Sequence, residues 1–561
     1  MSIHDQNKTI AYFSMEFGLR ANLRSYSGGL GILAGDHLKA SADLGLPIIG
    51  VGLFYHEGYF RQEIDAQGRQ SEHFERIAPH DSQLLPVAET LTLETSVGPI
   101  HFRAWKETGH GGDLYLLDTD LPENSQEFRA LTDQLYGGDR RMRLLQEYLL
   151  GVGGMALLNK LSIAPAKIHL NEGHVAFAAL EVAANLGDDF KSNCTRVQSH
   201  VHFTTHTPVD AGHDRFDTNL VTNLLAPFIN KLGAPPEEFL SLGRHGDDSQ
   251  FCMTTLALRL CASANGVSKL HGEVARGMWN DLKDSTPIGH VTNGVHRKTW
   301  TATGAENTAN FDDSKLWNLR NRLRGNLIKW LPRRVPTPLQ GAESVLDPNA
   351  LTVGFARRFA PYKRAMLLLD EPDRLAALLA STERPLQFLF AGKAHPQNEP
   401  GKELLARMIS LIREEPFRGK ILFLENYDME LAKYLVSGVD VWMNTPRRPL
   451  EASGTSGMKS ALNGGLNLSI LDGWWAEAYD GKNGFAVGAG EEFDSPEEQD
   501  RFDREALFQV LEQQVLPEFY DRNEDGLPKA WLKRIRHSLA TIPEHFSAER
   551  MVMEYDKNYY C

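Results

Sequence analysis

The feature that most constrains the fold is a regular alternation of β-rich runs and helix-forming segments in the C-terminal half. The β-rich runs are residues 351–355, 386–391, 421–424, 440–443 and 466–470. The segments between them with apolar residues at helical spacing are residues 363–380, 401–414, 429–436 and 457–463. Repeated strand–helix–strand units imply a parallel sheet with helices on both faces. The sequence therefore predicts an α/β fold with a doubly wound sheet.

The N-terminal half follows the same order at longer intervals. Its expected buried strands are residues 47–55, 167–170, 201–204 and 290–291. The segment 331–349 is rich in proline and polar residues and has no clean period, which predicts a hinge region. We expect an N-terminal Rossmann-like domain over residues 1–335 and a C-terminal one over 336–561. The final helices of the chain are candidates to pack back onto the N-terminal domain.

The composition excludes several classes of protein. With 42% hydrophobic and 24% charged residues, the chain is neither disordered nor fibrous. Its formal net charge of −14 argues against a general binder of nucleic-acid phosphates. Its four cysteines include no C-x-x-C pair, and no apolar run is long enough to span a bilayer. We expect a cytoplasmic protein with no nucleic-acid and no membrane partner.

Clusters of unusual residues follow expected strands, where open parallel sheets bind ligands. Residues 25–36, SYSGGLGILAGD, form a glycine-rich loop that runs into a helical pattern. Such a loop suits an anion, but a tight turn without a ligand is an equal alternative. Residues 354–364, GFARRFAPYKR, hold four cations within eight residues. Cations at the start of a helix oppose its dipole and call for an anion, so this cluster predicts a phosphate site.

A third cluster, residues 451–465, reads EASGTSGMKSALNGG. Its small residues lead into a short helix that carries one lysine, Lys459, among apolar neighbours. A desolvated lysine can present the neutral amine that a Schiff base with an aldehyde requires. The N–H groups and hydroxyls around Thr455 and Ser456 suit a phosphate. Together with the basic cluster, this loop predicts sites for an aldehyde cofactor's phosphate and a second phosphate.

The segment EASGTSGMKSALNGG resembles the pyridoxal-phosphate lysine motif of the α-glucan (glycogen, starch and maltodextrin) phosphorylases. The segments that resemble this family, in the family's order, are residues 27–60, 169–174, 203–209, 291–300, 355–364, 392–394, 424–427 and 451–472. The chain length and the GWWAEAYDGKNG segment are similar to the bacterial short-type branch. The resemblance implies a GT-B fold, two Rossmann-like doubly wound domains facing a deep cleft. It also implies pyridoxal 5'-phosphate in the C-terminal domain.

The resemblance also implies roles for single residues, with Lys459 similar to the Schiff-base lysine. The residues with implied catalytic roles are Arg358, Lys363, His206 and Lys459. The implied cofactor-binding residues are Lys459, Thr455, Ser456, Arg357, Tyr362 and Gly29. The implied substrate-binding residues are Gly29, Leu30, His206, Asn293, Glu451, Ser453 and Gly454. Glu451 is expected to hydrogen-bond the hydroxyls of the transferred glucose, and the alternative is that it orients Arg357, Arg358 or Lys363.

The implied reaction is retaining phosphorolysis of terminal α-1,4-glucosidic bonds of glycogen or maltodextrin, with release of α-D-glucose 1-phosphate. The implied partners are an α-1,4-glucan or maltodextrin, inorganic phosphate, glucose 1-phosphate and a second copy in a homodimer. The alternative is a nucleotide-sugar-dependent GT-B glycosyltransferase, similar to glucan synthases and without pyridoxal phosphate. A third interpretation is a non-catalytic glucan-binding module. A bound pyridoxal chromophore distinguishes the first function from the second.

This sequence departs from the family pattern at several positions. Arg357 stands where the family commonly has lysine, and Glu172 replaces an aspartate. A planar guanidinium has a different hydrogen-bonding geometry from an ammonium. Trp474 and Trp475 follow the third cluster, where they suit either core packing or a stacking platform for a glucan.

The histidines allow a metal site to be considered. His200 and His202 share one face of an expected strand, and His169 and His174 bracket a loop. Neither pair has the spacing of an H-E-x-x-H motif or of a two-histidine, one-carboxylate site. We therefore expect no metal site, and histidines that serve as hydrogen-bonding groups.

Overall fold

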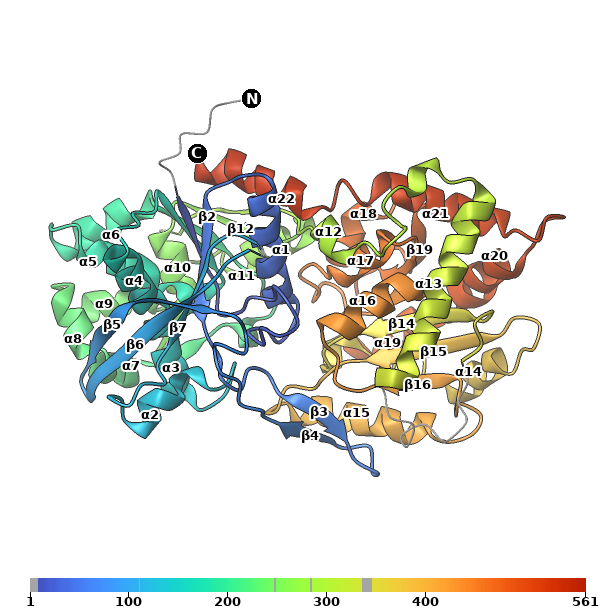
Figure 1. Ribbon diagram of the computed structural model, residues 1–561, viewed down its shortest axis with the longest axis horizontal. Helices are drawn as coiled ribbons and strands as arrows, with labels where there is room; N and C mark the ends of the chain where they lie inside the picture. Colours follow the sequence, from blue (N-terminus) through green and yellow to red (C-terminus); the bar gives the residue numbers. More distant parts are fainter. Residues whose placement is uncertain (1–8, 110, 247–248, 283–284, 335–345) are drawn as a thin grey trace. The chain divides into compact units, whose positions relative to one another are not determined.

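The computed structural model describes residues 9–109, 111–246, 249–282, 285–334 and 346–561. These residues form two compact units, neither of which is one continuous segment (Figure 1). Unit 1 combines the residues up to Phe60 with Phe74–Asn293 and Ala548–Cys561, and unit 2 combines Arg61–His73 with Gly294–Ser547. The last helix of the chain thus belongs to unit 1. The predicted domain boundary between residues 335 and 336, and most of the predicted hinge, lie outside the described residues.

Unit 1 is built on a nine-stranded sheet of order β13-β12-β9-β8-β1-β2-β7-β6-β5. In that order the strands are Ile288–His290, Ser263–Gly266, Val201–Thr204, Lys167–Asn171, Ile10–Phe13, Ile48–Leu53, Leu114–Asp118, Gly98–Glu107 and Leu85–Thr95. Pairing is parallel from β13 to β7, whereas β6 and β5 join as antiparallel strands. The four strands predicted in this half are confirmed as β2, β8, β9 and part of β13.

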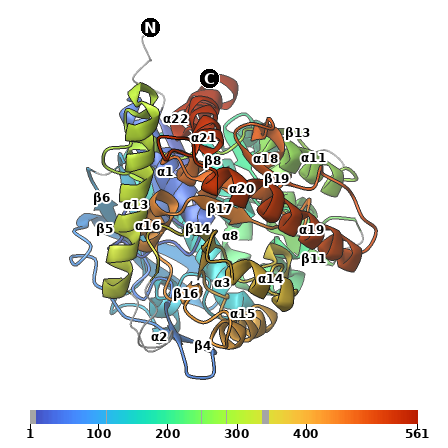
Figure 2. The ribbon, with the colours of Figure 1, turned by 90° about the vertical axis from the view of Figure 1, so that its right-hand side faces the viewer.

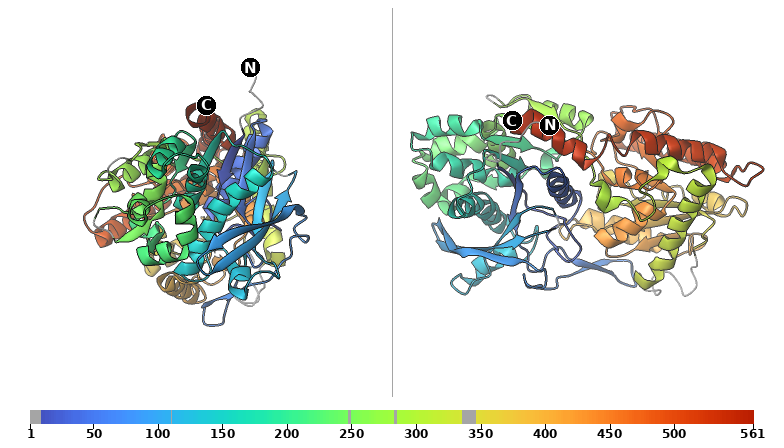
Figure 3. Two further views of the ribbon diagram at one scale, coloured as in Figure 1. Left: turned by 90° about the vertical axis from the view of Figure 1, so that its left-hand side faces the viewer. Right: turned by 45° about the horizontal axis from the view of Figure 1, so that its top comes forward.

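Helices flank the sheet of unit 1, as the left panel of Figure 3 shows. They are α1 (Gly29–Asp43), α2 (Gln126–Arg129), α3 (Arg140–Tyr148), α4 (Gly154–Lys160), α5 (Phe177–Ala184), α6 (Phe190–Gln198), α7 (Thr218–Leu224), α8 (Ala226–Lys231), α9 (Pro236–Gly243), α10 (Met253–Leu260), α11 (Lys269–Met278) and α22 (Ala548–Tyr555). A small ribbon, β10 (Arg215–Asp217) with β11 (Gln250–Cys252), lies outside the sheet.

Two apolar layers cover the two faces of this sheet because side chains alternate along each strand. On β1, Ala11 and Phe13 join a cluster that contains residues of α3, α4, α5 and α10. Ile10 and Tyr12 join a second cluster with residues of α1 and α22. The sequence of β1 therefore has no polar position, as expected for a strand buried on both faces.

Unit 2 contains a six-stranded, wholly parallel sheet of order β16-β15-β14-β17-β18-β19. In that order the strands are Ile421–Leu424, Leu386–Ala391, Leu351–Ala356, Val441–Asn444, Leu466–Ile470 and Gly484–Val487. Numbered within the unit, this is the order 3-2-1-4-5-6 of doubly wound nucleotide-binding sheets. The five strands predicted in this half are confirmed, and β19 is an additional one. With two parallel-rich sheets, the chain is a mixed α/β protein.

The helices of unit 2 include the long α13, which Figure 2 shows from the side. They are α12 (Arg297–Trp300), α13 (Asp313–Arg334), α14 (Pro372–Leu379), α15 (Glu399–Ile412), α16 (Met429–Gly438), α17 (Ser456–Ala461), α18 (Trp475–Ala478), α19 (Pro496–Val510), α20 (Leu516–Tyr520) and α21 (Lys529–Thr541). The helices predicted over residues 401–414, 429–436 and 457–463 are confirmed as α15, α16 and α17.

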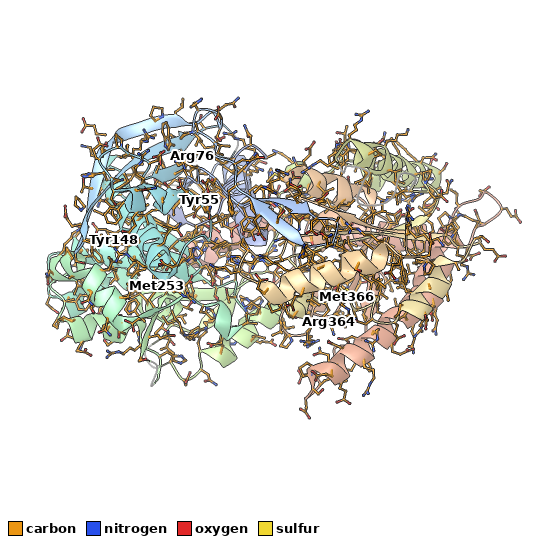
Figure 4. All side chains as sticks on the ribbon, turned by 90° about the horizontal axis from the view of Figure 1, so that it is seen from below. Tyr55, Arg76, Tyr148, Met253, Arg364 and Met366 are labelled. Carbon is orange, nitrogen blue, oxygen red and sulfur yellow. The ribbon has the colours of Figure 1, made fainter. Side chains whose placement is uncertain are left out.

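The helix predicted over residues 363–380 is wrong in its first half. Residues 361–363 form a single 3-10 turn, residues 365–370 form turns, and α14 begins only at Pro372. Arg364 has a left-handed backbone with φ of 51°. Arg364, labelled in Figure 4, is buried, and its guanidinium pairs with the carboxylates of Asp500 and Asp503, at 2.9 and 2.7 Å. These ion pairs fix the segment in turns. Arg364 is a structural cation rather than part of an anion site.

A two-stranded hairpin from the N-terminal part of the sequence belongs to unit 2. It consists of β3 (Arg61–Ile64) and β4 (Gln70–His73), which pair antiparallel. The four cysteines are free thiols. Within the described part of the chain, each helix is too short or too polar to cross a lipid bilayer.

Candidate functional site

The predicted basic cluster follows β14, the first strand of the sheet in unit 2. Strands β15 and β17 flank β14, so the strand order reverses there, and open α/β sheets bind ligands at the carboxyl ends of such strands. Arg357 comes directly after β14, and Asn444 is the last residue of β17. The Arg357 guanidinium donates to the carboxamide oxygen of Asn444. The sheet topology thus explains why these two residues, far apart in the sequence, are in contact.

Glu451 joins two of the predicted cations. Its carboxylate accepts from the Arg357 guanidinium and from the Lys363 ammonium, the latter at 2.5 Å. Glu451 is only 5% exposed. Burial alone would raise the pKa of this carboxyl, but Arg357 and Lys363 hold it below its ordinary value. Glu451 is therefore an ionised group that compensates two buried cations, as in the alternative in which it orients them.

Asp472 is a second buried carboxyl group in this cluster, and the sequence analysis did not select it. One of its oxygens accepts the backbone N–H of Glu451 at 2.9 Å, and the other accepts that of Gly473 at 2.8 Å. Burial, together with the nearby charge of Glu451, raises the pKa of Asp472 to about 7. A carboxyl group poised near neutral pH beside a cationic pair is typical of functional sites.

Two other predicted site residues of the basic cluster, Tyr362 and Arg358, are more exposed. Tyr362 is half-buried, and its ring centre lies 4.5 Å from the Lys363 ammonium. Arg358 is exposed to solvent. Burial lowers the pKa of His395, and the charge of Arg358 lowers it further, so the two side chains are near one another. The helix-dipole argument for an anion at this cluster does not apply, because no helix starts at Lys363.

Lys459 lies on α17, which follows β17 through the loop that contains Glu451. The lysine is only 6% exposed, and its ammonium lies 4.0 Å from the ring centre of Trp300. Asn463 donates to the Lys459 carbonyl at 2.9 Å and to the Trp300 carbonyl at 2.9 Å, so it joins α17 to α12. A buried lysine against an indole ring has the apolar surroundings that the sequence predicted for it.

The loop before α17 offers small polar groups. The Ser453 hydroxyl oxygen is buried and makes no hydrogen bond with the residues that the structure describes. Ser456 accepts from the Trp442 indole at 3.0 Å. Thr455, Ser456 and Gly454 are half-buried, so this stretch is partly open. An unsatisfied hydroxyl, a buried lysine and two cations fit a group with an aldehyde and a phosphate, as predicted for this loop.

In unit 1, the glycine loop leads into α1, which begins at Gly29. The carboxylate of Glu16 accepts the backbone N–H groups of Ser27 and Gly28, at 2.6 and 3.3 Å. The Tyr136 hydroxyl donates to the same carboxylate at 2.5 Å. The protein itself thus supplies an anion to the start of the loop. Gly29 is exposed and Leu30 is half-buried, so the part of the loop that they form is more open.

His206 follows β9 at the carboxyl edge of the sheet in unit 1. Its Nε2 lies 2.7 Å from the carboxamide oxygen of Asn171, and Asn171 donates its other end to Ser14 at 3.0 Å. Burial lowers the pKa of His206 to about 3, so the imidazole is neutral at pH 7. In the neutral ring, Nε2 donates to Asn171 and Nδ1 remains an acceptor. Asn171 thereby sets the tautomer of His206.

Glu172 stands next to Asn171 with an unusual backbone. Its φ of 84° is rare for a residue with a side chain and represents stored strain. The carboxylate accepts the His206 N–H at 2.9 Å and the Thr205 hydroxyl at 3.3 Å. Burial raises the pKa of Glu172 to about 7. This geometry supports the loop that carries His206.

Asn293 is the remaining predicted site residue of unit 1. Its backbone N–H donates to the Val267 carbonyl at 3.1 Å, and its carboxamide oxygen is buried. That oxygen makes no hydrogen bond among the described residues. The Nε2 of His271, whose Nδ1 accepts the Val267 N–H at 3.1 Å, is likewise buried and unbonded there. Two such polar atoms on either side of Val267 are suited to an external hydrogen-bonding ligand.

The histidines considered for a metal site are hydrogen-bonded to protein groups. His169 bonds Tyr560 and Thr204, at 2.6 and 2.8 Å, and His202 bonds Ser263 and Asn265, both at 2.8 Å. Burial lowers the pKa of His202 to about 3. These neutral rings link the sheet to the C-terminal helix. Of the two alternatives for Trp474 and Trp475, core packing is correct, because both are buried and Trp474 packs against Phe546.

The predicted site residues therefore fall into two groups. Arg357, Lys363 and Glu451 are in direct contact in unit 2, with Tyr362 beside them and Arg358 on the surface. Unit 2 also holds Ser453, Gly454, Thr455, Ser456 and Lys459, and unit 1 holds Gly29, Leu30, His206 and Asn293. The sequence analysis missed Glu16, Asn171, Asn444 and Asp472. A detectable signal existed, since each is a polar residue at or just after the end of an apolar strand.

Comparisons with known proteins support a relationship over nearly the whole chain. A family model described as carbohydrate phosphorylase matches residues 338–492. A glycogen phosphorylase of Mycobacterium tuberculosis is 41% identical, over 98% of this chain and 70% of that protein. A maltodextrin phosphorylase of Thermococcus litoralis is 42% identical, with the same coverage. A glycogen phosphorylase of Aquifex aeolicus is 36% identical, over 99% of this chain and 86% of that protein. The similarity thus includes residues of both units.

Proposed function

This chain belongs to the carbohydrate phosphorylase family, and we propose that it is an α-glucan phosphorylase. The reaction is retaining phosphorolysis of terminal α-1,4-glucosidic bonds of glycogen or maltodextrin. Inorganic phosphate is the second substrate, and α-D-glucose 1-phosphate is released. The proposal includes the GT-B fold and the division into domains at residues 335 and 336. It also includes the homodimer and the cytoplasmic location that the sequence predicts.

Members of this family use pyridoxal 5'-phosphate, and the residues around Lys459 fit this cofactor. When bound, the cofactor supplies a phosphate that exchanges a proton with the substrate phosphate. We assign Lys459 to the covalent anchor, because it is buried and its ammonium lies against the ring of Trp300. Thr455, Ser456 and the unsatisfied Ser453 hydroxyl are the small donors of the loop that leads to it. Tyr362 and Gly29 remain predicted cofactor contacts.

Arg357 and Lys363 supply the positive charge that an anionic reactant requires. An arginine has five N–H donors and a lysine has three, so both can contact phosphate while they keep the bonds to Asn444 and Glu451. Glu451 holds the two cations together, since without a carboxylate they would repel each other. We propose that this is its principal role. In this proposal, the remaining acceptor sites of the Glu451 carboxylate receive hydrogen bonds from sugar hydroxyls. Arg358, exposed beside this pair, is assigned to the incoming phosphate.

His206 and Asn293 are assigned to the sugar. The His206 Nδ1 is an acceptor because Asn171 fixes the opposite nitrogen as the donor, so it can receive a sugar hydroxyl. The carboxamide oxygen of Asn293 is buried and unsatisfied among the described residues, and a second hydroxyl would satisfy it. Leu30 and Gly454 are assigned to the same substrate through their backbone N–H groups.

The observation that carries the proposal is the contact of Arg357 and Lys363 with Glu451, in the loop that leads to the buried Lys459. The test uses the purified full chain with maltodextrin. We expect a near-ultraviolet pyridoxal chromophore that acid releases, and production of glucose 1-phosphate that depends on inorganic phosphate. A colourless protein that instead transfers glucose from a nucleotide sugar would identify the alternative, a glycosyltransferase without this cofactor.

A further inference from the structure

The β3–β4 hairpin of unit 2 has an unusual buried face. Along the hairpin, Gln62, Ile64 and Gln70 are buried, whereas Arg61, Glu63, Ser71 and His73 are exposed. Ile64 enters the apolar core of unit 2. A hairpin that only covered this core would present apolar side chains at all buried positions. Two buried glutamines are costly unless every amide group finds a partner, so their contacts indicate what the hairpin does.

Both glutamines bind the backbone of the loop after β15. Gln70 binds the two sides of one residue: its Oε1 accepts the Ala394 N–H at 3.0 Å, and its Nε2 donates to the Ala394 carbonyl at 2.9 Å. Gln62 donates to the Gly392 carbonyl at 3.0 Å and to Gln70 at 2.9 Å. The hairpin therefore holds Gly392 and Ala394 through side-chain amides, as a neighbouring strand would hold them through its backbone.

The loop at residues 392–394 in turn supports the segment with the basic cluster. The Lys393 carbonyl accepts the Phe359 N–H at 3.0 Å, and the Ala391 carbonyl accepts the Arg357 N–H at 3.1 Å. Gly392 lies so close to this segment that a Cβ there would overlap the Arg357 carbonyl oxygen. Two backbone bonds and one close approach thus connect residues 391–393 to the segment from Arg357 to Phe359.

The hairpin also holds the loop after β16. Gln62 and Asn426 form a reciprocal pair, in which the Asn426 N–H donates to Gln62 Oε1 at 2.8 Å and the Gln62 N–H donates to Asn426 Oδ1 at 3.2 Å. The Ile64 N–H donates to the Glu425 carboxylate at 2.8 Å. Glu72 pairs with Lys402 of α15 at 3.2 Å. The hairpin therefore spans the carboxyl ends of two adjacent strands, β15 and β16.

We propose that Gln62 and Gln70 are positioning residues that hold the Arg357–Arg358 segment in the geometry required for binding the substrate phosphate. The inference rests on the proposed phosphorolysis for its kinetic consequence. The hairpin acts on the anion site through the loop at residues 392–394, and none of the hairpin contacts described above involves Lys459, His206 or Asn293.

The test compares Gln70→Leu and Gln62→Leu with two controls in the full chain. Gln387→Leu removes a buried glutamine near the start of β15, the end opposite to the loop at residues 392–394. There it forms hydrogen bonds with Asp347 and Thr352. Glu63→Gln changes the exposed face of the hairpin. The first readout is backbone hydrogen exchange followed by mass spectrometry, which requires no turnover. The second is the KM for inorganic phosphate and for maltodextrin, together with cofactor absorbance.

We expect faster exchange in residues 391–395 and 355–360 for both hairpin variants, and not for either control. The phosphate KM should rise about tenfold, as expected when buried hydrogen bonds are lost, and by more than the maltodextrin KM, with the cofactor anchored at Lys459 retained. Unchanged exchange in these two segments would overturn the inference, as would a phosphate KM that rises equally in Gln387→Leu. If the wild-type protein does not phosphorolyse glucan, the proposed function is wrong and the exchange measurement alone decides the inference.

Discussion

The carboxylate of Asp472 accepts the backbone N–H of Glu451, so two buried carboxyl groups lie beside each other in unit 2. Only one of them is compensated directly. Glu451 bonds Arg357 and Lys363, whereas Asp472 receives backbone N–H groups. This difference explains why burial and the Glu451 charge raise the pKa of Asp472, while the two cations lower that of Glu451.

The Asp472 carboxyl gives the protein a specific pH dependence. Its pKa is about 7 in the folded protein and near 3.8 in the unfolded chain, so the folded state holds the proton more tightly. The resulting stabilisation is complete below about pH 4 and is lost as pH rises through 7, at about 1.4 kcal/mol per pH unit within that range. Asp472→Asn should reduce the fall in unfolding free energy between pH 5 and 8, measured by urea denaturation. An identical pH dependence in variant and wild type would contradict this assignment.

Lys459→Ala is expected to eliminate cofactor absorbance and reduce phosphorolysis to background, because the proposed role of the lysine is covalent attachment. The fold should persist, as checked by far-ultraviolet circular dichroism. Lys433→Ala, which removes an exposed lysine from α16, is the matched control and should retain both properties. Full activity of a chromophore-free Lys459→Ala protein would exclude the proposed mechanism.

Glu451→Gln should remove the carboxylate that pairs with both Arg357 and Lys363. The expected loss is about 1–3 kcal/mol of unfolding free energy, because the amide still accepts one hydrogen bond but carries no charge. Inorganic phosphate or sulfate should then raise the melting temperature more than in wild type, since an added anion replaces the missing charge. Glu403→Gln on α15, an exposed position, is the control. If added anions stabilise the variant less than wild type, Glu451 does not compensate these cations.

Glu16 is expected to order the glycine loop of unit 1. Glu16→Ala removes the acceptor for the Ser27 and Gly28 N–H groups and for the Tyr136 hydroxyl. Hydrogen exchange of the loop should accelerate about tenfold, which corresponds to the loss of about 1.4 kcal/mol of local stability. Tyr136→Phe, which removes one of these donors, should have a smaller effect. Equal exchange in all three proteins would show that the loop does not depend on this carboxylate.

Two glycines of unit 2 should respond in opposite ways to alanine. At Gly392, φ is 143° and an added Cβ would overlap the Arg357 carbonyl, so Gly392→Ala should destabilise the protein by about 1–3 kcal/mol or more. At Gly325, within α13, no atom lies within 4 Å of an added Cβ. Gly325→Ala should stabilise the protein by about 0.5–1 kcal/mol. Thermal unfolding of both variants distinguishes the two positions.

Much of the fold was predictable because buried parallel strands have continuous apolar sequences. Residues 386–391 and 466–470 belong to this type, and both predictions are confirmed. By contrast, β12 has the sequence SANG, which contains no apolar run. Its buried Asn265 is accommodated by hydrogen bonds with His202, Thr204 and Tyr555. The hairpin was missed for a similar reason, since its buried positions are mainly glutamines.

The candidate site was predictable where a local motif marks it and not where the topology creates it. The loop from Glu451 to Lys459 is recognisable because its small residues and single lysine are contiguous. The contact of Arg357 with Asn444 depends on β14 and β17 being neighbours, which the sequence order alone does not specify. Arg364 shows the opposite error. It belongs to the same run of cations, yet its charge is paired with the carboxylates of Asp500 and Asp503, and these ion pairs stabilise the fold.

The docking of the β3–β4 hairpin has a consequence for folding during synthesis on the ribosome. Gln62 and its partner Asn426 are 364 residues apart. At a synthesis rate of roughly 5–20 residues per second, the Asn426 loop is translated about 20–70 seconds after the hairpin. A fragment that starts at Gly294 would lack the hairpin altogether, and the backbone groups of Gly392 and Ala394 would lose the partners described above. The loops after β15 and β16 therefore obtain these partners only from a segment that is translated long before them.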